Sequence, residues 1–408
     1  MLFTAPTAAA IAPEVAAEGD EIVQNSLAFV RGHLDMDLAY ISEFVGDKLV
    51  FRAVNAPGFE DVVHTGNSVP LQGSYCDLVV AGHLPEMIPD TSKEALAMSL
   101  AITHQMPVRS YVSVPIRRTD GSIYGTFCCV GKEARPSLNT RDLEVVRAFA
   151  SLAADQVNAR LSFESVVQGK RDAIEAILNT RGFEIALQPI LRLKDQGTAG
   201  YEALCRFSPD PYRAPNLWFD DAAEVGLQTA LEVYVIEVAL QILPDLPANC
   251  YLAVNSSPET LATGKLSTLI AAVGGERVVV EVTEHTAIDD LDVFLMEIDR
   301  LRDLGVRIAI DDAGAGYSGL QQIIRLRPDV IKLDMSLTHD VDKDVARRAL
   351  ASAMVQFAQD TNARVVAEGI ETEAELRTLK SLGVEMGQGY HLGRPALSSI
   401  VLKQVQSA

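Results

Sequence analysis

Short apolar runs of strand length recur through the second half of the chain, and helical patterns separate most of them. In order, the runs are EIALQPI, GYEALCRF, YLAVNSS, VVVEVTE, RIAIDDAG, VIKLD, RVVAEGIE and MGQGYHL. Residues 221–243 and 344–361 are two of the helical stretches between them. Eight strands that alternate with helices predict a (β/α)8 barrel, a TIM-like α/β fold with its active site at the carboxyl ends of the strands.

The first connection of this barrel departs from the pattern. Between LQPILRL and GYEALCRF the chain has only the link KDQGTAG, which is too short for a crossover helix. Parallel neighbours need such a crossover, whereas antiparallel neighbours are joined by a tight hairpin. We therefore expect the first strand to run antiparallel to the second.

Polar side chains lie within or just after every run, and the densest set belongs to the fourth and fifth runs. These two end in Glu281 with Glu284 and in Asp311 with Asp312, and a helical pattern over 289–304 joins them. Because both strands of a βαβ unit point the same way, the four carboxylates are expected to converge on one rim. Acids at such close range are tolerated when positive charge lies among them.

The first half of the chain has an α+β order instead. A helical pattern over 21–33 precedes the strand patterns LAYISEF and KLVFRAV, and then the hairpin YVSVPIRRTDGSIYGTFCCVG with Asp120-Gly121 at its turn. A further helix is expected to begin at the N-cap candidate Thr140. With the Ser74-Tyr75-Cys76 segment, this order resembles a GAF domain, a small ligand-binding sensor fold, over residues 20–160.

The resemblance does not identify the small ligand or signal of this GAF-like region. Cys76 is a candidate for holding or reacting with a ligand, but a small cysteine in the core is the favoured interpretation. Residues 1–19 are rich in alanine and proline and lack the basic start of a signal peptide, so we expect a disordered lead-in.

After the GAF-like region the helical pattern continues, and residues 161–178 are expected to form a helical linker. Apolar residues at alternating spacings of three and four run from Leu143 to Val157, which is a short heptad stripe. The stripe fits a helix that packs on its own sheet, and it fits equally well a helix that pairs across a homodimer.

Composition narrows the function classes. The formal net charge of −20 excludes a general basic surface for nucleic-acid polymers. A phosphate-bearing ligand therefore needs local positive charge, from a few basic residues or from divalent metal. The five cysteines include no CxxC pair, and the hydrophobic runs are too short to span a membrane, so we expect a cytoplasmic protein with reduced thiols.

A second resemblance covers residues 179–408. YEALCR, NSS, EVTE, DDAGAGYSG, KLD, AEGIE and QGY occur in order over about 230 residues. Together these motifs resemble an EAL domain, the phosphodiesterase that cleaves cyclic di-GMP to linear pGpG. The resemblance implies a cyclic-guanylate-specific phosphodiesterase, with the GAF-like region tuning its rate.

The chemistry of the strand-end residues is consistent with this. Carboxylates and an amide oxygen, with no histidine or cysteine among them, form a hard oxygen site that suits Mg²⁺ or Mn²⁺. Two such ions about 3.5–4 Å apart can clamp a phosphodiester and activate a water. By resemblance, the ligands of the two ions are Glu202, Asn255, Glu281, Asp311, Asp312 and Glu368, with Asp311 as the bridge.

The resemblance also assigns the remaining site residues. Lys332, Glu368 and Glu202 are the catalytic candidates, and Lys332 is expected beside the attacking hydroxide. The candidates for lining the substrate groove are Gln188, Leu204, Arg206, Asp334, Glu371 and Gln388. Glu284 is expected to brace the ligands from outside. Each strand-end acid also has a plainer interpretation, because such residues often cap helices.

Two rival functions are weighed against the phosphodiesterase. The segment GAGYSG, with Asp334 about twenty residues later, has the spacing of a dinucleotide-binding fingerprint. A nicotinamide oxidoreductase is rejected because Asp311 and Asp312 would lie beside the pyrophosphate. The other rival is a receptor that binds cyclic di-GMP without cleaving it. It stays open because Ala313 and Ala315 occupy a loop where the resembling family commonly has an aromatic residue after the acid pair.

Overall fold

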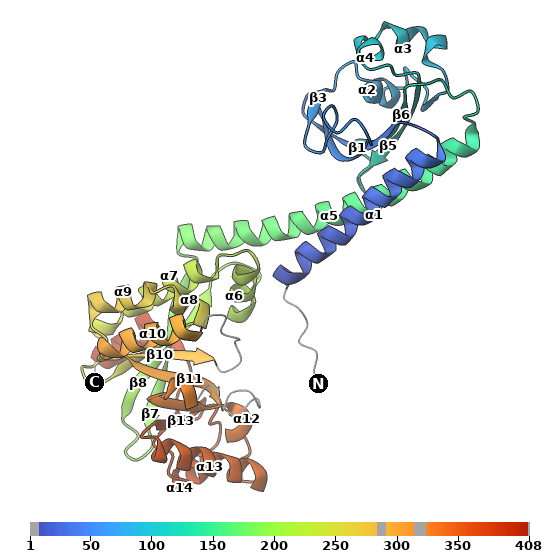
Figure 1. Cartoon of the computed structure of the whole chain (residues 1–408). Helices are drawn as coiled ribbons and strands as arrows, with labels where there is room; N and C mark the ends of the chain where they lie inside the picture. The colour runs from blue at the N-terminus through green and yellow to red at the C-terminus, as the bar shows by residue number, and fades with distance from the viewer. Residues whose placement is uncertain (1–7, 284–290, 314–323, 407–408) are drawn as a thin grey trace. The chain divides into compact units, whose positions relative to one another are not determined.

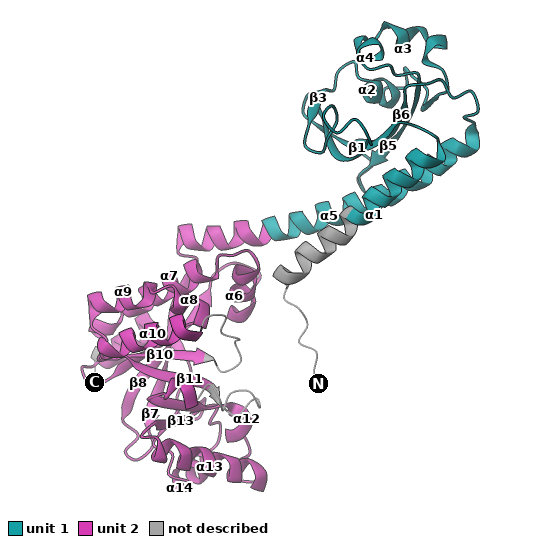
Figure 2. Ribbon diagram, viewed as in Figure 1, with its two compact units in different colours: residues 1–168 teal, residues 169–408 magenta. Residues whose placement is uncertain are grey.

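The computed structural model describes residues 8–283, 291–313 and 324–406. The chain divides into two compact units, residues 1–168 and residues 169–408 (Figure 2). In the described part of the chain, no helix has the combination of length and apolarity that is needed to cross a lipid bilayer.

Unit 1 is built on a six-stranded antiparallel sheet with the strand order β3-β2-β1-β6-β5-β4. Its elements are α1 (Ala8–His33), β1 (Leu38–Val45), β2 (Lys48–Asn55), β3 (Ser68–Pro70), α2 (Tyr75–Val80), β4 (Met87–Ile88), the 3-10 turn η1 (Thr91–Lys93), α3 (Ala95–Ser99), α4 (Ala101–Gln105), β5 (Ser110–Arg117), β6 (Ile123–Gly131) and α5 (Thr140–Thr180). The predicted hairpin is β5 and β6, and Gly121 in its turn has a φ of +84°, which favours glycine.

Helices α1 and α5 pack on one face of this sheet (Figure 1). Leu27 and Val30 of α1 share a buried cluster with Val146 and Ala150 of α5 and with inward-facing strand residues. The heptad stripe of α5 is therefore buried within its own unit. This burial supports the first of its two interpretations, a helix that packs on its own sheet.

The other face of the sheet holds a second buried cluster that includes Cys76 of α2. The Cys76 Sγ lies 3.4 Å from the Tyr40 hydroxyl and 3.5 Å from the Cys128 Sγ. Cys76 is 1% exposed, so the structure places it in the core, and it also lines a cavity of about 580 Å³.

The ends of two helices differ from the sequence expectations. Helix α1 begins at Ala8, so residues 8–19, for which the sequence predicts disorder, are helical, and residues 1–7 lie outside the described part. Helix α5 is capped by Asn139 and not by Thr140, because the Asn139 Oδ1 accepts the Arg141 N–H at 2.9 Å. The predicted linker, residues 161–178, lies inside α5.

Unit 2 is a closed eight-stranded barrel. Its strands are β7 (Phe183–Arg192), β8 (Thr198–Phe207), β9 (Tyr251–Asn255), β10 (Val278–Thr283), β11 (Arg307–Ala313), β12 (Val330–Leu333), β13 (Arg364–Ala367) and β14 (Met386–Gly387). They are hydrogen-bonded in chain order, and β14 pairs with β7 to close the barrel. Strand β7 is antiparallel to β8, as predicted, and also to β14, while β8 to β14 run parallel.

Helices surround this barrel. They are α6 (Pro215–Glu224), α7 (Gln228–Leu240), the 3-10 turn η2 (Leu243–Asp245), α8 (Pro258–Ala262), α9 (Lys265–Val273), α10 (Leu291–Asp303), α12 (Met335–Thr338), α13 (Val345–Asp360), α14 (Glu373–Ser381) and α15 (Ser398–Gln406), with a short strand β15 (Ala396–Leu397) that pairs with β7. The single helix predicted over 221–243 is two helices, because the chain turns between them at Gly226, whose φ is +72°.

Candidate active site

The polar residues of the barrel interior form a layer directly above an apolar one. Residues two apart on a strand share a face, and each of five parallel strands carries a polar residue two positions after an apolar interior residue. The pairs are Ala253 and Asn255, Val279 and Glu281, Ala309 and Asp311, Val330 and Lys332, and Val366 and Glu368. The apolar members form one buried cluster, so the polar members lie together at the carboxyl ends of the strands.

Lys332 of β12 is the centre of this polar layer. Its Nζ lies 2.7 Å from Glu281 Oε2, 2.8 Å from Glu368 Oε1 and 3.0 Å from Asp311 Oδ1. Glu202 Oε2 of β8 is 3.7 Å away. The lysine side chain is 1% exposed, so one buried ammonium group faces four carboxylates, three from β8, β10 and β11 and one from Glu368 directly after β13.

This crowding changes the proton affinities of the cluster. Burial raises the pKa of Glu281 well above its usual value, and repulsion from Glu202 and Asp311 adds to the rise, which the nearby Lys332 reduces. Burial likewise raises the pKa of Glu368, to about 7. Burial opposes the charge of Lys332, but the surrounding carboxylates outweigh it and raise the pKa well above the usual value. One ammonium therefore does not fully offset the negative charge of this layer.

Glutamine and asparagine side chains extend the cluster around Glu202. Asn255 Nδ2 donates to Glu202 Oε1 at 3.0 Å, and Gln388 Nε2 donates to Glu202 Oε2 at 2.6 Å and to Gln188 Oε1 at 2.9 Å. Burial opposes the ionised form of Glu202, but Lys332 and these amide donors outweigh it and lower the pKa. Gln388 Oε1 is buried and accepts no hydrogen bond from the described residues, which marks a place for a ligand atom or water.

Four predicted groove residues lie outside these contacts. Leu204 and Arg206 follow Glu202 on the same face of β8, and the Arg206 Nη1 donates to the Cys205 carbonyl at 2.9 Å. Asp334 caps α12, since its Oδ1 accepts the Ser336 N–H at 2.9 Å. Glu371 is exposed in the loop after β13. Their roles toward substrate stay predictions.

Glu284 and residues 314–319 lie outside the described residues, and so does the side chain of Asp312, whose backbone belongs to β11.

Two buried acids that support the site were missed by the sequence analysis. Glu232 of α7 accepts the Ser257 N–H and hydroxyl, both at 2.9 Å, and so fixes the turn after Asn255. Nothing in the local pattern indicates this long-range contact. Glu375 of α14 accepts the backbone N–H of Glu371 at 3.0 Å. It belongs to a Thr372–Glu375 capping box, a pattern that is readable from sequence.

The fold and site define a TIM-like barrel with a reversed first strand and an acid-rich centre at its carboxyl-terminal rim. The family model for the EAL domain matches residues 171–395, and the chain belongs to this family. A family model for the GAF domain matches residues 18–157, so the chain also carries a GAF domain.

Two curated relatives and one solved structure are similar to part of this chain. The chain is 31% identical over 240 residues to the bifunctional diguanylate cyclase/cyclic di-GMP phosphodiesterase MucR of Pseudomonas aeruginosa, over 56% of this chain and 35% of that protein. It is 28% identical over 234 residues to the cyclic di-GMP phosphodiesterase PdeF of Escherichia coli, over 54% of this chain and 31% of that protein. The chain thus spans about a third of the length of these two relatives.

The solved structure is the phosphodiesterase of PaMucR in complex with c-di-GMP. It matches with a TM-score of 0.53 and 29% identity, over 57% of this chain and 99% of that one.

Proposed function

We propose that this chain is a phosphodiesterase that hydrolyses cyclic di-GMP to linear pGpG with two divalent cations, Mg²⁺ or Mn²⁺. The cyclic di-GMP phosphodiesterase activity for which MucR and PdeF are named supports the reaction class, and the PaMucR complex supports the ligand. The observation that carries the proposal is the layer of four carboxylates that surrounds the buried Lys332.

The residues of this layer fit divalent cations. The donors are carboxylate oxygens and the amide oxygen of Asn255, whose amide nitrogen is already used in the bond to Glu202. Such oxygen ligands suit Mg²⁺ and Mn²⁺. The raised pKa values of Glu281 and Glu368 show a shortage of positive charge that cations would relieve.

Glu202, Asn255, Glu281, Asp311, Asp312 and Glu368 would hold the two cations. When bound, the cations would neutralise the phosphodiester and lower the pKa of the attacking water. Lys332 would keep its ammonium beside the reacting phosphate and stabilise the negative charge that develops there. Arg206, on the same face of β8 as Glu202, would pair with substrate phosphate through its planar guanidinium group.

The glutamine pair would orient the substrate. Gln188 Nε2 donates to the Gly393 carbonyl at 3.2 Å, and this hydrogen bond fixes the position of the glutamine side chain. Gln388, hydrogen-bonded to both Gln188 and Glu202, would present its unused carbonyl oxygen to a donor on the guanine bases or on a bound water. Leu204, Asp334 and Glu371 would complete the groove, and Glu284 would brace the ligands.

The decisive test is turnover of cyclic di-GMP by the full chain with Mg²⁺ or Mn²⁺, followed by chromatography of pGpG. Removing an outer-shell partner of a metal typically costs 10–100-fold in activity, so Glu202→Gln, which removes a ligand, should cost more than about 100-fold. Excess EDTA should abolish turnover, and added Mn²⁺ should restore it.

The matched control is Glu237→Gln, the same chemical change at an exposed position of α7, which should leave the rate unchanged. If the full chain binds cyclic di-GMP tightly but forms no pGpG with either metal, the receptor alternative replaces the enzyme.

The setting of this activity is also a proposal. We place the protein in the cytoplasm as a homodimer whose GAF domain binds a small ligand or signal and tunes the rate. Equal turnover by the full chain and by residues 169–408, across the conditions tested, would argue against this regulation.

A further inference from the structure

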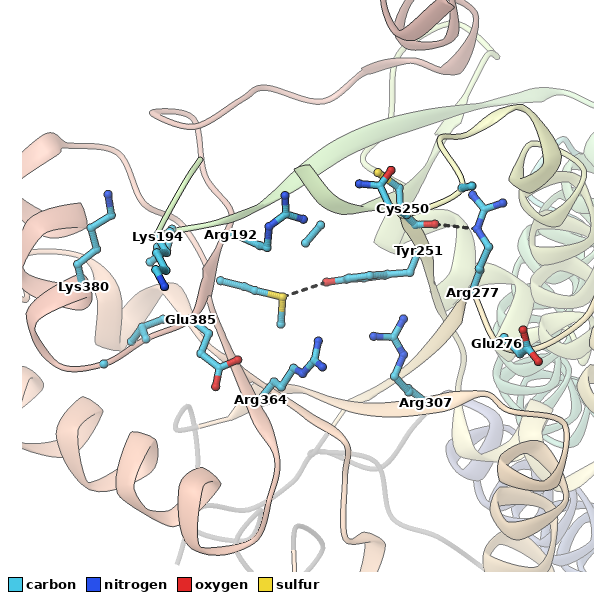
Figure 3. A pocket seen from close by; sticks show the side chains of 17 residues that line it. Arg192, Lys194, Cys250, Tyr251, Glu276, Arg277, Arg307, Arg364, Lys380 and Glu385 are labelled. Atoms are coloured by element: carbon cyan, nitrogen blue, oxygen red, sulfur yellow. Dashed lines mark hydrogen bonds between the residues drawn. The ribbon is translucent and has the colours of Figure 1, made fainter. Parts of the chain in front are cut away.

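A second cavity lies at the opposite end of the barrel from the carboxylate layer. It has a volume of about 840 Å³ and is drawn from close by in Figure 3. The first residues of β9, β11, β13 and β14 line it, together with Arg192, the last residue of the reversed strand β7. Its volume is within the range of small-molecule sites.

The alternation of the strands explains why basic side chains gather here. Arg307 and Arg364, the first residues of β11 and β13, each lie two positions before an apolar residue of the interior cluster, on the same face of their strands. Arg277, directly before β10, has the same spacing to Val279. The interior thus has a basic layer, an apolar layer and an acidic layer in succession. At about 3.3 Å per residue, Arg307 lies roughly 13 Å along β11 from Asp311, so this cavity is separate from the carboxylate layer.

The cavity is strongly positive in a chain whose formal net charge is −20. Six basic residues line it, against the two acids Glu276 and Glu385. The basic residues are Arg192, Lys194, Arg277, Arg307, Arg364 and Lys380. A concentration of one charge in a concave site attracts ligands of the opposite charge.

Two of the six have structural hydrogen bonds. Arg277 donates to the carbonyls of Cys250, Leu246 and Pro247 at 2.8 to 3.1 Å and so ties β10 to the turn before β9. Arg192 donates to Asp195 at 3.2 Å.

Arg307 and Arg364 differ from these. Among the described residues neither guanidinium group forms an ion pair or hydrogen bond, and Figure 3 shows both extending toward Tyr251. Burial lowers the pKa of Arg307, and the positive charge of Arg364 lowers it further, against opposite effects of Tyr251 and Asp329. Two neighbouring guanidinium groups whose N–H donors have no acceptor among the described residues are a ready site for an anion.

The floor of the cavity is fixed in place. The Arg307 Cζ lies 4.7 Å from the centroid of the Tyr251 ring, and the Tyr251 hydroxyl lies 3.9 Å from the Met386 sulfur. Gly200 touches the same ring, since a Cβ at that position would lie 2.6 Å from its atoms. The ring and the arginine stem therefore form a preformed, partly apolar surface beside the charges.

We propose that this cavity binds a phosphorylated small molecule of nucleotide or sugar-phosphate size. Its phosphate would sit on the guanidinium groups of Arg307 and Arg364, and its organic part would lie against Tyr251 and the apolar wall. A phosphate has several acceptor oxygens. The planar guanidinium group of an arginine can donate two parallel hydrogen bonds to such oxygens.

Isothermal titration calorimetry of the full chain in EDTA tests this proposal, with GMP, ribose 5-phosphate and inorganic phosphate as separate probes. The expected result is saturable binding of one equivalent of GMP or of ribose 5-phosphate. Tighter binding of the former identifies a nucleotide site, and tighter binding of the latter a sugar-phosphate site. Arg307→Gln and Arg364→Gln should each weaken binding by about tenfold or more.

Two controls carry the same loss of charge. Arg377→Gln removes an exposed arginine of α14 that pairs with Glu373, and Arg206→Gln removes the arginine near the carboxylate layer. Both should bind the probes as the unchanged chain does. If Arg307→Gln fails to fold, Arg364→Gln decides, because its side chain is exposed. No binding at millimolar probe, or binding that only Arg206→Gln abolishes, overturns the proposal.

Discussion

A buried lysine among four carboxylates is an expensive arrangement unless every charge has partners. Lys332 is 1% exposed and has three carboxylate oxygens within 3.0 Å. Removing one member of a buried ionic group leaves the others uncompensated, which costs more than the group contributes as a whole. The lysine therefore stabilises the folded barrel when no metal is bound, and it is also a candidate catalytic group.

We predict that Lys332→Met lowers the free energy of unfolding in EDTA by about 3 kcal/mol, because the remaining carboxylates lose their cation. Urea unfolding of the full chain measures this change. Mn²⁺ should stabilise the variant more than the unchanged chain, since it supplies the missing charge, while turnover stays reduced. A variant that is as stable as the unchanged chain in EDTA would contradict this account.

Sequence reasoning predicted that the strand pattern brings polar residues together at one end of the barrel, and the structure places several of them there. Glu281, Asp311 and Glu368 could be predicted because the carboxyl ends of parallel strands share one rim. Asp334 has the same local pattern, yet the structure shows it capping α12, and sequence alone cannot separate these two uses of a strand-end acid. Glu232 could not be predicted, because its contact with Ser257 depends on how two distant segments pack.

At the scale of elements, the link between α5 and α6 rests on a small ionic network. Lys170 Nζ of α5 lies 2.9 Å from Asp221 Oδ1, and Arg213 Nη2 lies 2.6 Å from Asp221 Oδ2. Burial opposes ionisation of Asp221, but these two cations outweigh it and lower the pKa. Arg171 adds a hydrogen bond to the Val225 carbonyl at 2.7 Å.

This network predicts a pH dependence of stability. The folded pKa of Asp221 is below the unfolded value of about 3.9, so its contribution is present above that pH and is lost as pH falls through the folded pKa. Asp221→Asn should therefore cost about 1–2 kcal/mol at pH 7 and less near pH 2. Chemical unfolding at both pH values measures the difference.

A matched control for this change is Asp299→Asn on α10, where the pair with Arg302 is 3.5 Å long and the aspartate side chain is 77% exposed. It should change stability little at either pH. If Asp221→Asn lowered the free energy of unfolding equally at pH 2 and pH 7, packing and not charge would stabilise the contact between α5 and α6.

Element boundaries were the least predictable part of the fold. The reversed strand β7 followed from the short link KDQGTAG, which leaves room only for a hairpin. The division of 221–243 into α6 and α7 was missed, although Gly226 marks it, because a single glycine in a strongly apolar helical pattern does not prove a break. The helix over residues 8–19 was missed because alanine with proline also fits disorder.

The whole molecule consists of two units that each bury a core of their own. The clusters of unit 1 are built around its sheet, and the interior cluster of unit 2 fills its barrel. Domains with separate cores unfold separately unless a large interface couples them.

We therefore predict two transitions in calorimetric unfolding of the full chain. A ligand stabilises only the unit that binds it, so Mn²⁺ should raise the midpoint of one transition and leave the other unchanged. Residues 169–408, measured alone, should reproduce the transition that responds. One cooperative transition, or an equal shift of both, would show that the units are coupled.

The reversal of β7 decides where the chain enters the barrel. In an all-parallel barrel the first strand starts at the end remote from the chemistry, but Phe183 at the start of β7 pairs with Phe207 at the end of β8. The last turns of α5 thus arrive at the end of the barrel that holds the carboxylate layer, where Lys170 pairs with acids of α6, the helix that follows the strand carrying Glu202 and Arg206. Only the loop of residues 208–214 separates α6, which Lys170 of α5 contacts, from the end of β8 that carries Arg206.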